Sequence, residues 1–247
     1  MVANIDIDPS IFLSKEYSDN PYPTLKLLRD QQPVYYNSLI KQWMVTRYED
    51  VMNIFADTEN FSASPNGDHI GAVFGPTLME FDGEEHRKLR GVVAPEFVGM
   101  KLQSLLPIVQ RNAMALIQKF TTKQASLIAE KAALKGEIDI VDDFATRLPL
   151  NVILDVLDLP QEAHEMFHSW YPAMMNGISG GPNLRIAGQK ANAEYHNYLD
   201  PLIKERSLNP GDDLLSRLSV TEVDGKRMTP AEIKSFASLI PVSYTHL

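Results

Sequence analysis

Residues 81–97 read FDGEEHRKLRGVVAPEF, and this stretch decides how the rest of the chain is interpreted. Asp82 can cap a helix, and Glu85 stands at the third helical position, which is the capping-box pattern of a helix start. Pro95 is expected to bend or end the same helix, since proline lacks the N–H that a helix interior needs. The sequence therefore predicts a helix that begins at Asp82.

His86 and Arg90 lie four residues apart in this segment. On a helix they share one face, about one turn apart, and both side chains can be cationic hydrogen-bond donors. Near a helix start, such a pair is suited to binding a carboxylate or a phosphate. The plainer alternative is a solvated basic face, because Arg87 and Lys88 stand between them, and the spacing alone favours that alternative.

The composition is that of an ordinary globular protein. Of the 247 residues, 44% are hydrophobic and 22% are charged. The net charge of −9 disfavours nucleic acid or anionic lipid as a partner. The sequence holds no cysteine, so these residues offer no disulfide, thiolate ligand or cysteine nucleophile. No signal-peptide pattern and no run of roughly 18 apolar residues is present, so we expect a cytoplasmic protein without a membrane segment.

The pattern along the chain predicts a mainly α fold. Residues 34–36 and 43–45 are β-prone runs around a turn, and Asp224-Gly225 is a hairpin-turn signal. Residues 62–76 predict a long loop, and Thr229 with Pro230 and Glu232 predicts a helix start. Further helices are expected over about 102–120, 144–157, from Pro160, 184–207 and 214–220. Strands do not alternate regularly with helices, which argues against a doubly wound sheet.

On these residues, the segment 81–97 resembles the C helix of cytochromes P450, in which an H-x-x-x-R pair on one face binds the haem propionates. His86 and Arg90 fall on those two positions. Four further stretches resemble the same family in the same order. They are NPYPTLKLLRDQQPVYY from Asn20, WMVTRYEDVMNIFADTENFSAS from Trp43, IDIVDDFATRLPLNVILDVLDLP from Ile138, and DDLLSRL from Asp212 followed by EVDGKRMTPAEIKSFASLI from Glu222.

The resemblance implies a soluble, bacterial-type cytochrome P450 fold, an orthogonal helix bundle with small β-sheets. Residues 1–240 would form the amino-terminal part of a single domain, cut at the start of the central I helix. Residues 241–247 would be an unrelated tail. We expect this boundary to leave Phe236, Leu239 and the helix over 152–157 without part of their packing.

The resemblance also implies a haem-dependent monooxygenase that oxidises a small organic substrate with O2. Its cofactor would be heme b (iron protoporphyrin IX), and electrons would come from NAD(P)H through a ferredoxin or flavodoxin and its reductase. The family's iron-ligating cysteine and its acid–alcohol pair are absent from these residues, so the chain alone is expected to be inactive. A non-catalytic fragment is therefore the second hypothesis.

Two apolar regions correspond to segments that flank the family's substrate pocket, and ordinary packing is the alternative for both. One lies in or just after the long loop, and the other at the end of the helix that follows Pro160. The predicted substrate contacts are Ala72, Val73, Phe74, Leu78, Met174, Met175 and Ile178.

His164-Glu165-Met166-Phe167-His168 fits the H-E-x-x-H pattern of zinc peptidases. On a helix it would place two imidazoles one turn apart with Glu165 as base, and Glu194 could be a third ligand. Against this, the motif starts within two turns of Pro160, at what is expected to be an exposed helix start. A zinc hydrolase is accordingly the third hypothesis, behind the haem protein.

Overall fold

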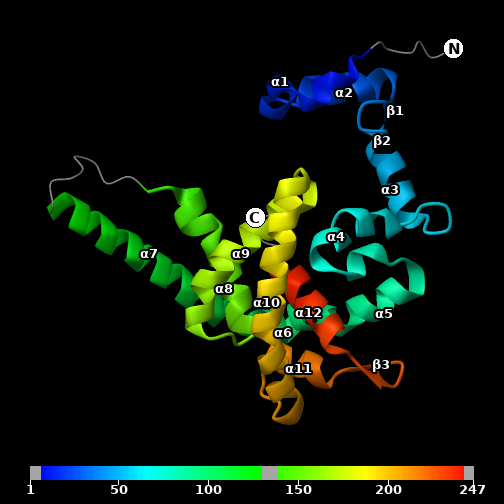
Figure 1. Cartoon of the computed structure of the whole chain (residues 1–247). Coiled ribbons are helices and arrows are strands. Elements are labelled where there is room, and N and C mark those ends of the chain that lie inside the picture. Colours follow the sequence, from blue (N-terminus) through cyan, green and yellow to red (C-terminus); the bar gives the residue numbers. More distant parts are fainter. Residues whose placement is uncertain (1–6, 130–137, 242–247) are drawn as a thin grey trace. The chain divides into compact units, whose positions relative to one another are not determined.

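The computed structural model describes residues 7–129 and 138–241, without the side chains of 122–129 (Figure 1). It divides into two compact units, Met1–Ser62 and Ala63–Leu247, each of which is described by itself. The single domain predicted over residues 1–240 stays a prediction. The tail predicted at 241–247 lies outside the described residues except for Pro241.

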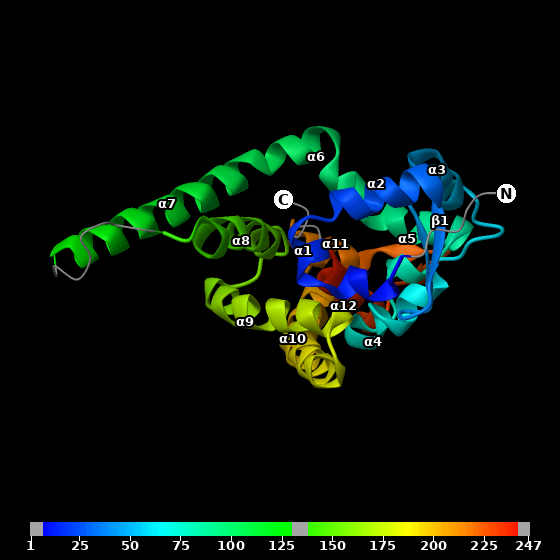
Figure 2. The same ribbon diagram turned by 90° about the horizontal axis from the view of Figure 1, so that it is seen from above.

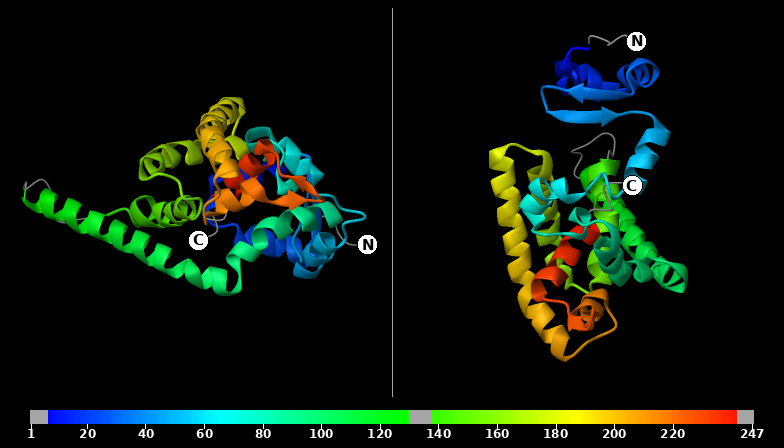
Figure 3. Two further views of the ribbon diagram at one scale, coloured as in Figure 1. Left: turned by 90° about the horizontal axis from the view of Figure 1, so that it is seen from below. Right: turned by 90° about the vertical axis from the view of Figure 1, so that its right-hand side faces the viewer.

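The first unit is a small helical segment around one β-hairpin (Figure 3, right). Strands β1 and β2 pair antiparallel, from Val34 opposite Val45 to Asn37 opposite Gln42, which confirms the two β-prone runs. Asn37 Oδ1 accepts hydrogen bonds from the N–H groups of Leu39 and Ile40 and so holds the turn. Its elements are η1 (Pro9–Leu13), α1 (Lys15–Asp19), α2 (Tyr22–Gln31), β1 (Val34–Asn37), β2 (Gln42–Val45) and α3 (Tyr48–Ala56).

The second unit is almost entirely helical, with one small hairpin (Figure 2). Its elements are η2 (Ser64–Asp68), α4 (Gly71–Phe74), η3 (Leu78–Glu80), α5 (Gly83–Val93), η4 (Ala94–Phe97), α6 (Gly99–Ser104), α7 (Leu106–Ala129), the π-helical η5 (Val141–Ala145), α8 (Arg147–Val156), α9 (Gln161–Ser179), α10 (Pro182–Leu208), α11 (Leu214–Val220), β3 (Glu222–Val223), β4 (Lys226–Arg227) and α12 (Pro230–Leu239). The predicted loop over 62–76 therefore contains two short helical turns, η2 and α4.

Local sequence signals explain several of these boundaries. Thr229 and Glu232 form the predicted capping box at the start of α12, since each side chain bonds to the other residue's backbone N–H. Asp224 and Gly225 both have positive φ, 52° and 74°, as a tight hairpin turn between β3 and β4 requires. Gly99 has φ 57° and starts α6 just after the break that Pro95 introduces.

Helices α9 and α10 form the centre of the second unit, and α4, α8, α11 and α12 pack around them. The rings of Phe167 on α9 and Tyr195 on α10 meet edge to face, with centroids 4.4 Å apart, and neither side chain is exposed. Such aromatic pairs contribute packing beyond the area that they bury. Both views in Figure 3 show α10 beside α9 and α12.

The expected loss of packing at α8 and α12 is wrong for most of the residues named. Phe236 is 4% exposed, because α10 and α11 pack against α12. Leu157, at the end of α8, is fully buried. The uncovered apolar face lies instead on α7, where Leu106, Met114 and Ile117 are more than two-fifths exposed on the side away from α8. Leu116 on the other side of α7 is buried.

Within the described residues, no single helix is long and apolar enough to cross a membrane, although the bent pair Gly83–Phe97 and Gly99–Thr121 meets the same length and composition criteria together.

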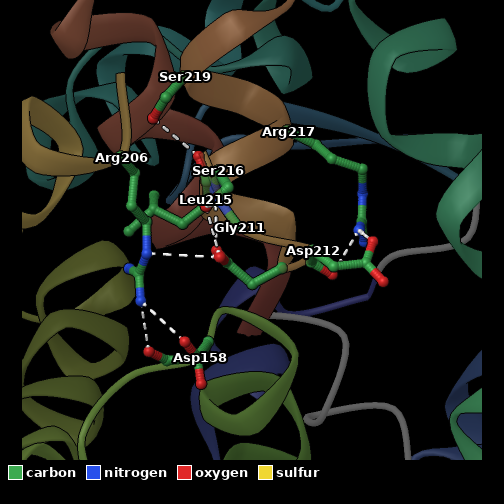
Figure 4. Close-up of polar contacts among 9 residues, drawn as sticks. Asp158, Arg206, Gly211, Asp212, Leu215, Ser216, Arg217 and Ser219 are labelled. Carbon is green, nitrogen blue, oxygen red and sulfur yellow. Dashed lines mark hydrogen bonds and ion pairs between the residues drawn. The ribbon is translucent and has the colours of Figure 1, made fainter. Parts of the chain in front are cut away.

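Arg206 is a buried cation that joins three elements near the end of α10 (Figure 4). Its Nη2 donates to the backbone oxygen of Asp158 at 2.6 Å, in the turn between α8 and α9. Its Nε lies 3.4 Å from Oδ2 of Asp213, the residue that caps α11 by accepting from the N–H of Ser216. The guanidinium therefore fixes the start of α11 relative to the α8–α9 turn.

We predict that Arg206→Ala lowers the free energy of unfolding by about 3 kcal/mol, because it leaves the carboxylate of Asp213 buried without its partner cation. Lys204→Ala removes an equal charge from an exposed position two residues away on the same helix, and should change stability by less than about 0.5 kcal/mol. Urea unfolding of both variants measures the difference. Equal losses would show that the ion pair does not hold the junction.

Candidate functional site

Helix α5 carries the pair of basic residues that the sequence singles out. The helix begins at Gly83, whose φ is 55°, with Asp82 as the N-cap residue. The predicted capping box does not form, because the Asp82 carboxylate makes no cap hydrogen bond. It accepts instead from the N–H of Ala63, at 3.1 and 2.9 Å, and so ties the start of α5 to the start of the 63–80 segment.

His86 and Arg90 lie one turn apart on α5, as predicted. Arg90 is exposed and His86 is half-buried. Across the described part of the chain, neither side chain makes a hydrogen bond or ion pair with another residue. Two basic side chains on one helical face, both without protein partners, are suited to an anionic ligand.

The two cations between them are held by the protein itself. Arg87 Nε donates to the backbone oxygen of Gly83 at 3.2 Å. Lys88 Nζ lies 3.1 Å from carboxylate oxygens of both Asp224 and Glu84, and the bond to Asp224, followed by that to Glu84, raises the lysine pKa above its ordinary value. Of the four basic residues at positions 86–90, Arg87 and Lys88 therefore have protein partners, whereas His86 and Arg90 have none in the described structure.

A cavity of about 850 Å³ opens on another side of α5, between it, the β3–β4 hairpin and the start of α12. Its lining from α5 is Glu84, Glu85, Lys88 and Leu89. At 100° per residue these positions lie on the face away from His86 and Arg90. The sequence gave no sign of this cavity, because its walls come from two stretches far apart in the chain, residues 76–89 and 223–236.

The predicted substrate contacts come together in two groups. Val73, Phe74 and Met174 are at most 3% exposed and belong to the core, and α4 packs directly against α9. Ala72, Met175 and Ile178 are half-buried beside them. Leu78 alone lines the large cavity. Their contact with a substrate stays a prediction.

The H-E-x-x-H motif faces a neighbouring helix rather than a metal. His164 is 3% exposed and its Nε2 lies 3.6 Å from Asp155 Oδ1, while His168 Nε2 is 2.9 Å from Asn151 Oδ1. The start of α9 is therefore less exposed than the sequence indicated. Glu194 Oε2 accepts from the indole N–H of Trp170. Within the described ranges, no three His, Cys, Asp or Glu side chains are grouped so as to hold a metal ion.

Two histidines in these helix contacts have strongly lowered pKa values. Burial, followed by the charge of Arg147, lowers the pKa of His168 to about 4. Burial, followed by the charge of Lys234, lowers that of His196 to about 4. His196 Nε2 is 3.0 Å from Ser238 Oγ and so links α10 to α12.

These pKa values predict how stability depends on pH. Between about pH 6.5 and 4 both rings are neutral in the folded chain but protonated in the unfolded chain, so the unfolded state binds more protons. The free energy of unfolding should fall as the pH falls through this window. Urea unfolding at pH 7, 6 and 5 measures it, and His196→Asn should make the fall shallower. His69→Asn, at an exposed position, should follow the wild type. If His196→Asn also follows the wild-type curve, the buried ring is not responsible.

The chain is similar to known proteins over most of its length. No family model matches the chain. The chain is 30% identical over 225 residues to pulcherriminic acid synthase of Bacillus subtilis (strain 168), covering 90% of this chain and 53% of that protein. It is 29% identical over 240 residues to cytochrome P450(MEG) of Priestia megaterium, covering 93% and 56%. The solved structure of the cytochrome P450 PksS of B. subtilis 168 superposes with a TM-score of 0.73 at 25% identity, covering 96% of this chain and 58% of that one.

The chain is a partial cytochrome P450. It spans about half the length of the curated relatives it matches. The predicted fold class is confirmed, since the mainly helical structure with small β-sheets superposes on solved P450 structures. The contact of His86 and Arg90 with haem propionates stays a prediction.

Proposed function

We propose that the whole protein to which this partial P450 belongs is a haem-dependent monooxygenase that oxidises a small organic substrate with O2. Its P450 relatives support the haem and the oxidative chemistry. The observation that carries the proposal in this chain is the pair His86 and Arg90, which lie on one face of α5 without a partner in the described structure.

The residues present fit the periphery of a haem but do not supply its iron ligand. Two unpaired cationic donors are suited to the two propionates, or to one propionate together, because charge-assisted bonds to a carboxylate are strong. The 247 residues contain no cysteine, so the thiolate typical of the family would come from sequence outside them. When bound, the haem would supply the redox chemistry, while His86 and Arg90 would fix its orientation.

We further propose that electrons reach this haem from NAD(P)H through a ferredoxin or flavodoxin and its reductase, in the cytoplasm. The relatives support a need for electron delivery, as P450 monooxygenation consumes O2 and reducing equivalents. The substrate remains a small organic molecule, without a narrower class.

A second candidate applies to the 247-residue chain by itself, as a non-catalytic fragment. Its lack of a cysteine favours this, since thiolate ligation drives O–O bond cleavage in the family. The zinc hydrolase alternative gains no support, because the side chains of Glu194, His164 and His168 face other protein groups.

We predict that Arg90→Ala weakens haem retention by about ten- to a hundredfold in the completed protein, because it removes a charge-assisted contact of about 1.5–3 kcal/mol. The iron ligand should not change, so the reduced carbonyl complex keeps its thiolate-type Soret band. Haem titration followed by absorbance measures both. In the 247-residue chain alone, haem should bind weakly and without that band.

Arg87→Ala is the matched control, since Arg87 bonds to its own helix and should leave haem affinity unchanged. Unchanged affinity in Arg90→Ala would remove Arg90 from the site. A thiolate-type carbonyl spectrum from the 247-residue chain would contradict the requirement for an outside ligand.

A further inference from the structure

Helices α9 and α10 approach each other closely at two glycines. A Cβ added to Gly177 would lie 3.2 Å from Gly188 Cα and 3.2 Å from the backbone oxygen of Leu184. A Cβ added to Gly188 would lie 3.0 Å from the backbone oxygen of Ala173. Because these neighbours are backbone atoms, a methyl group at either position requires the facing helix to shift by a few tenths of an ångström.

Val73 of α4 occupies the same crossing. Its Cγ2 would be 3.2 Å from a Cβ at Gly177, and its Cγ1 would be 3.3 Å from a Cβ at Gly188. One branched side chain, 3% exposed, therefore contacts both helices at the point where they meet. A β-branched side chain has little freedom at χ1, so its two methyl groups follow the backbone of α4 closely.

The backbone around Val73 is fastened at two further places. Gln189 Nε2, next to Gly188, donates to the backbone oxygen of Ala72 at 2.8 Å. Ser235 Oγ on α12 donates to the backbone oxygen of Pro76 at 2.6 Å. Gly75, with φ 78°, ends α4 between these two bonds. The turn 71–76 is thus held at the crossing by the Val73 side chain and the bond from Gln189, and on α12 by the bond from Ser235.

We propose that Val73 is a positioning residue that couples the turn 71–76 to the separation of α9 and α10 at Gly177 and Gly188. A wider crossing loosens the packing of Val73 against both helices, and truncation of Val73 leaves a void where the helices meet. Close packing transmits such a change because neither side can deform smoothly. The coupling is reciprocal. The coupling is a property of the packing and does not depend on haem. It connects the turn 71–76 with the end of α9, the two segments predicted to flank the substrate.

Hydrogen exchange of the 247-residue chain, read by mass spectrometry at neutral pH, tests the coupling from the helix side. Gly177→Ala should speed exchange of the amides of Val73, Phe74 and Gly75 by about tenfold, within the usual range of coupling between sites. These amides donate to the backbone oxygens of Ile70 and Gly71. Gly91→Ala is the matched control, because a Cβ added at that helical glycine of α5 meets nothing within 4 Å.

Val73→Ala changes the turn and reads the effect in the two helices. This variant alone tests the coupling if Gly177→Ala does not fold. It should speed exchange around residues 173–177 and 184–188, whereas Val93→Ala, which truncates a core valine on α5, should not. The coupling is supported if Gly177→Ala speeds exchange selectively in the turn 71–76 and Val73→Ala speeds it selectively around residues 173–177 and 184–188. Unchanged exchange at the partner, or an equal acceleration in α8 that marks global loosening, would overturn it.

Discussion

Helices α9 and α10 pack so closely that a Cβ at Gly177 or Gly188 would meet backbone atoms of the other helix. The crossing places Phe167 against Tyr195 in the centre of the core. Four other helices, α4, α8, α11 and α12, pack on this pair, so their positions follow from it. A buried ion pair through Arg206 then fixes the far end of α10 against α11 and the α8–α9 turn.

The division of charge on α5 connects this packing to function. Lys88 is held by Asp224 because the β3–β4 hairpin lies beside α5, and Arg87 bonds to its own helix. Only the face carrying His86 and Arg90 is left without partners in the part of the chain that the structure describes. Basic residues that a protein leaves unpaired on one helical face are available to a bound anion, and the binding of an anion by this pair stays a prediction.

Local patterns in the sequence predicted the elements whose causes are local. The capping box of Thr229 and Glu232, the Asp224-Gly225 turn and the one-turn spacing of His86 and Arg90 all depend on residues within one or two turns. Local patterns did not predict which basic residues of α5 would have protein partners. The pairing of Lys88 depends on Asp224, which is 136 residues away along the chain.

Long-range contacts also explain the features that the sequence did not predict. Asp82 has the right neighbours for a capping box, yet its carboxylate bonds to Ala63, which is 19 residues away. His164 follows an expected exposed helix start, but α8 covers it. The glycines of the α9–α10 crossing resemble ordinary loop or helix glycines until the partner helix is in place.

The reading frame beyond the codon for Ile240 tests most directly whether these residues are part of a longer haem protein. We expect the uninterrupted gene to encode, after Ile240, the rest of one apolar helix that contains a run of small residues, an acid and a threonine. It should also encode a cysteine farther downstream. Independent genomic reads that show a stop codon directly after Leu247 would contradict this.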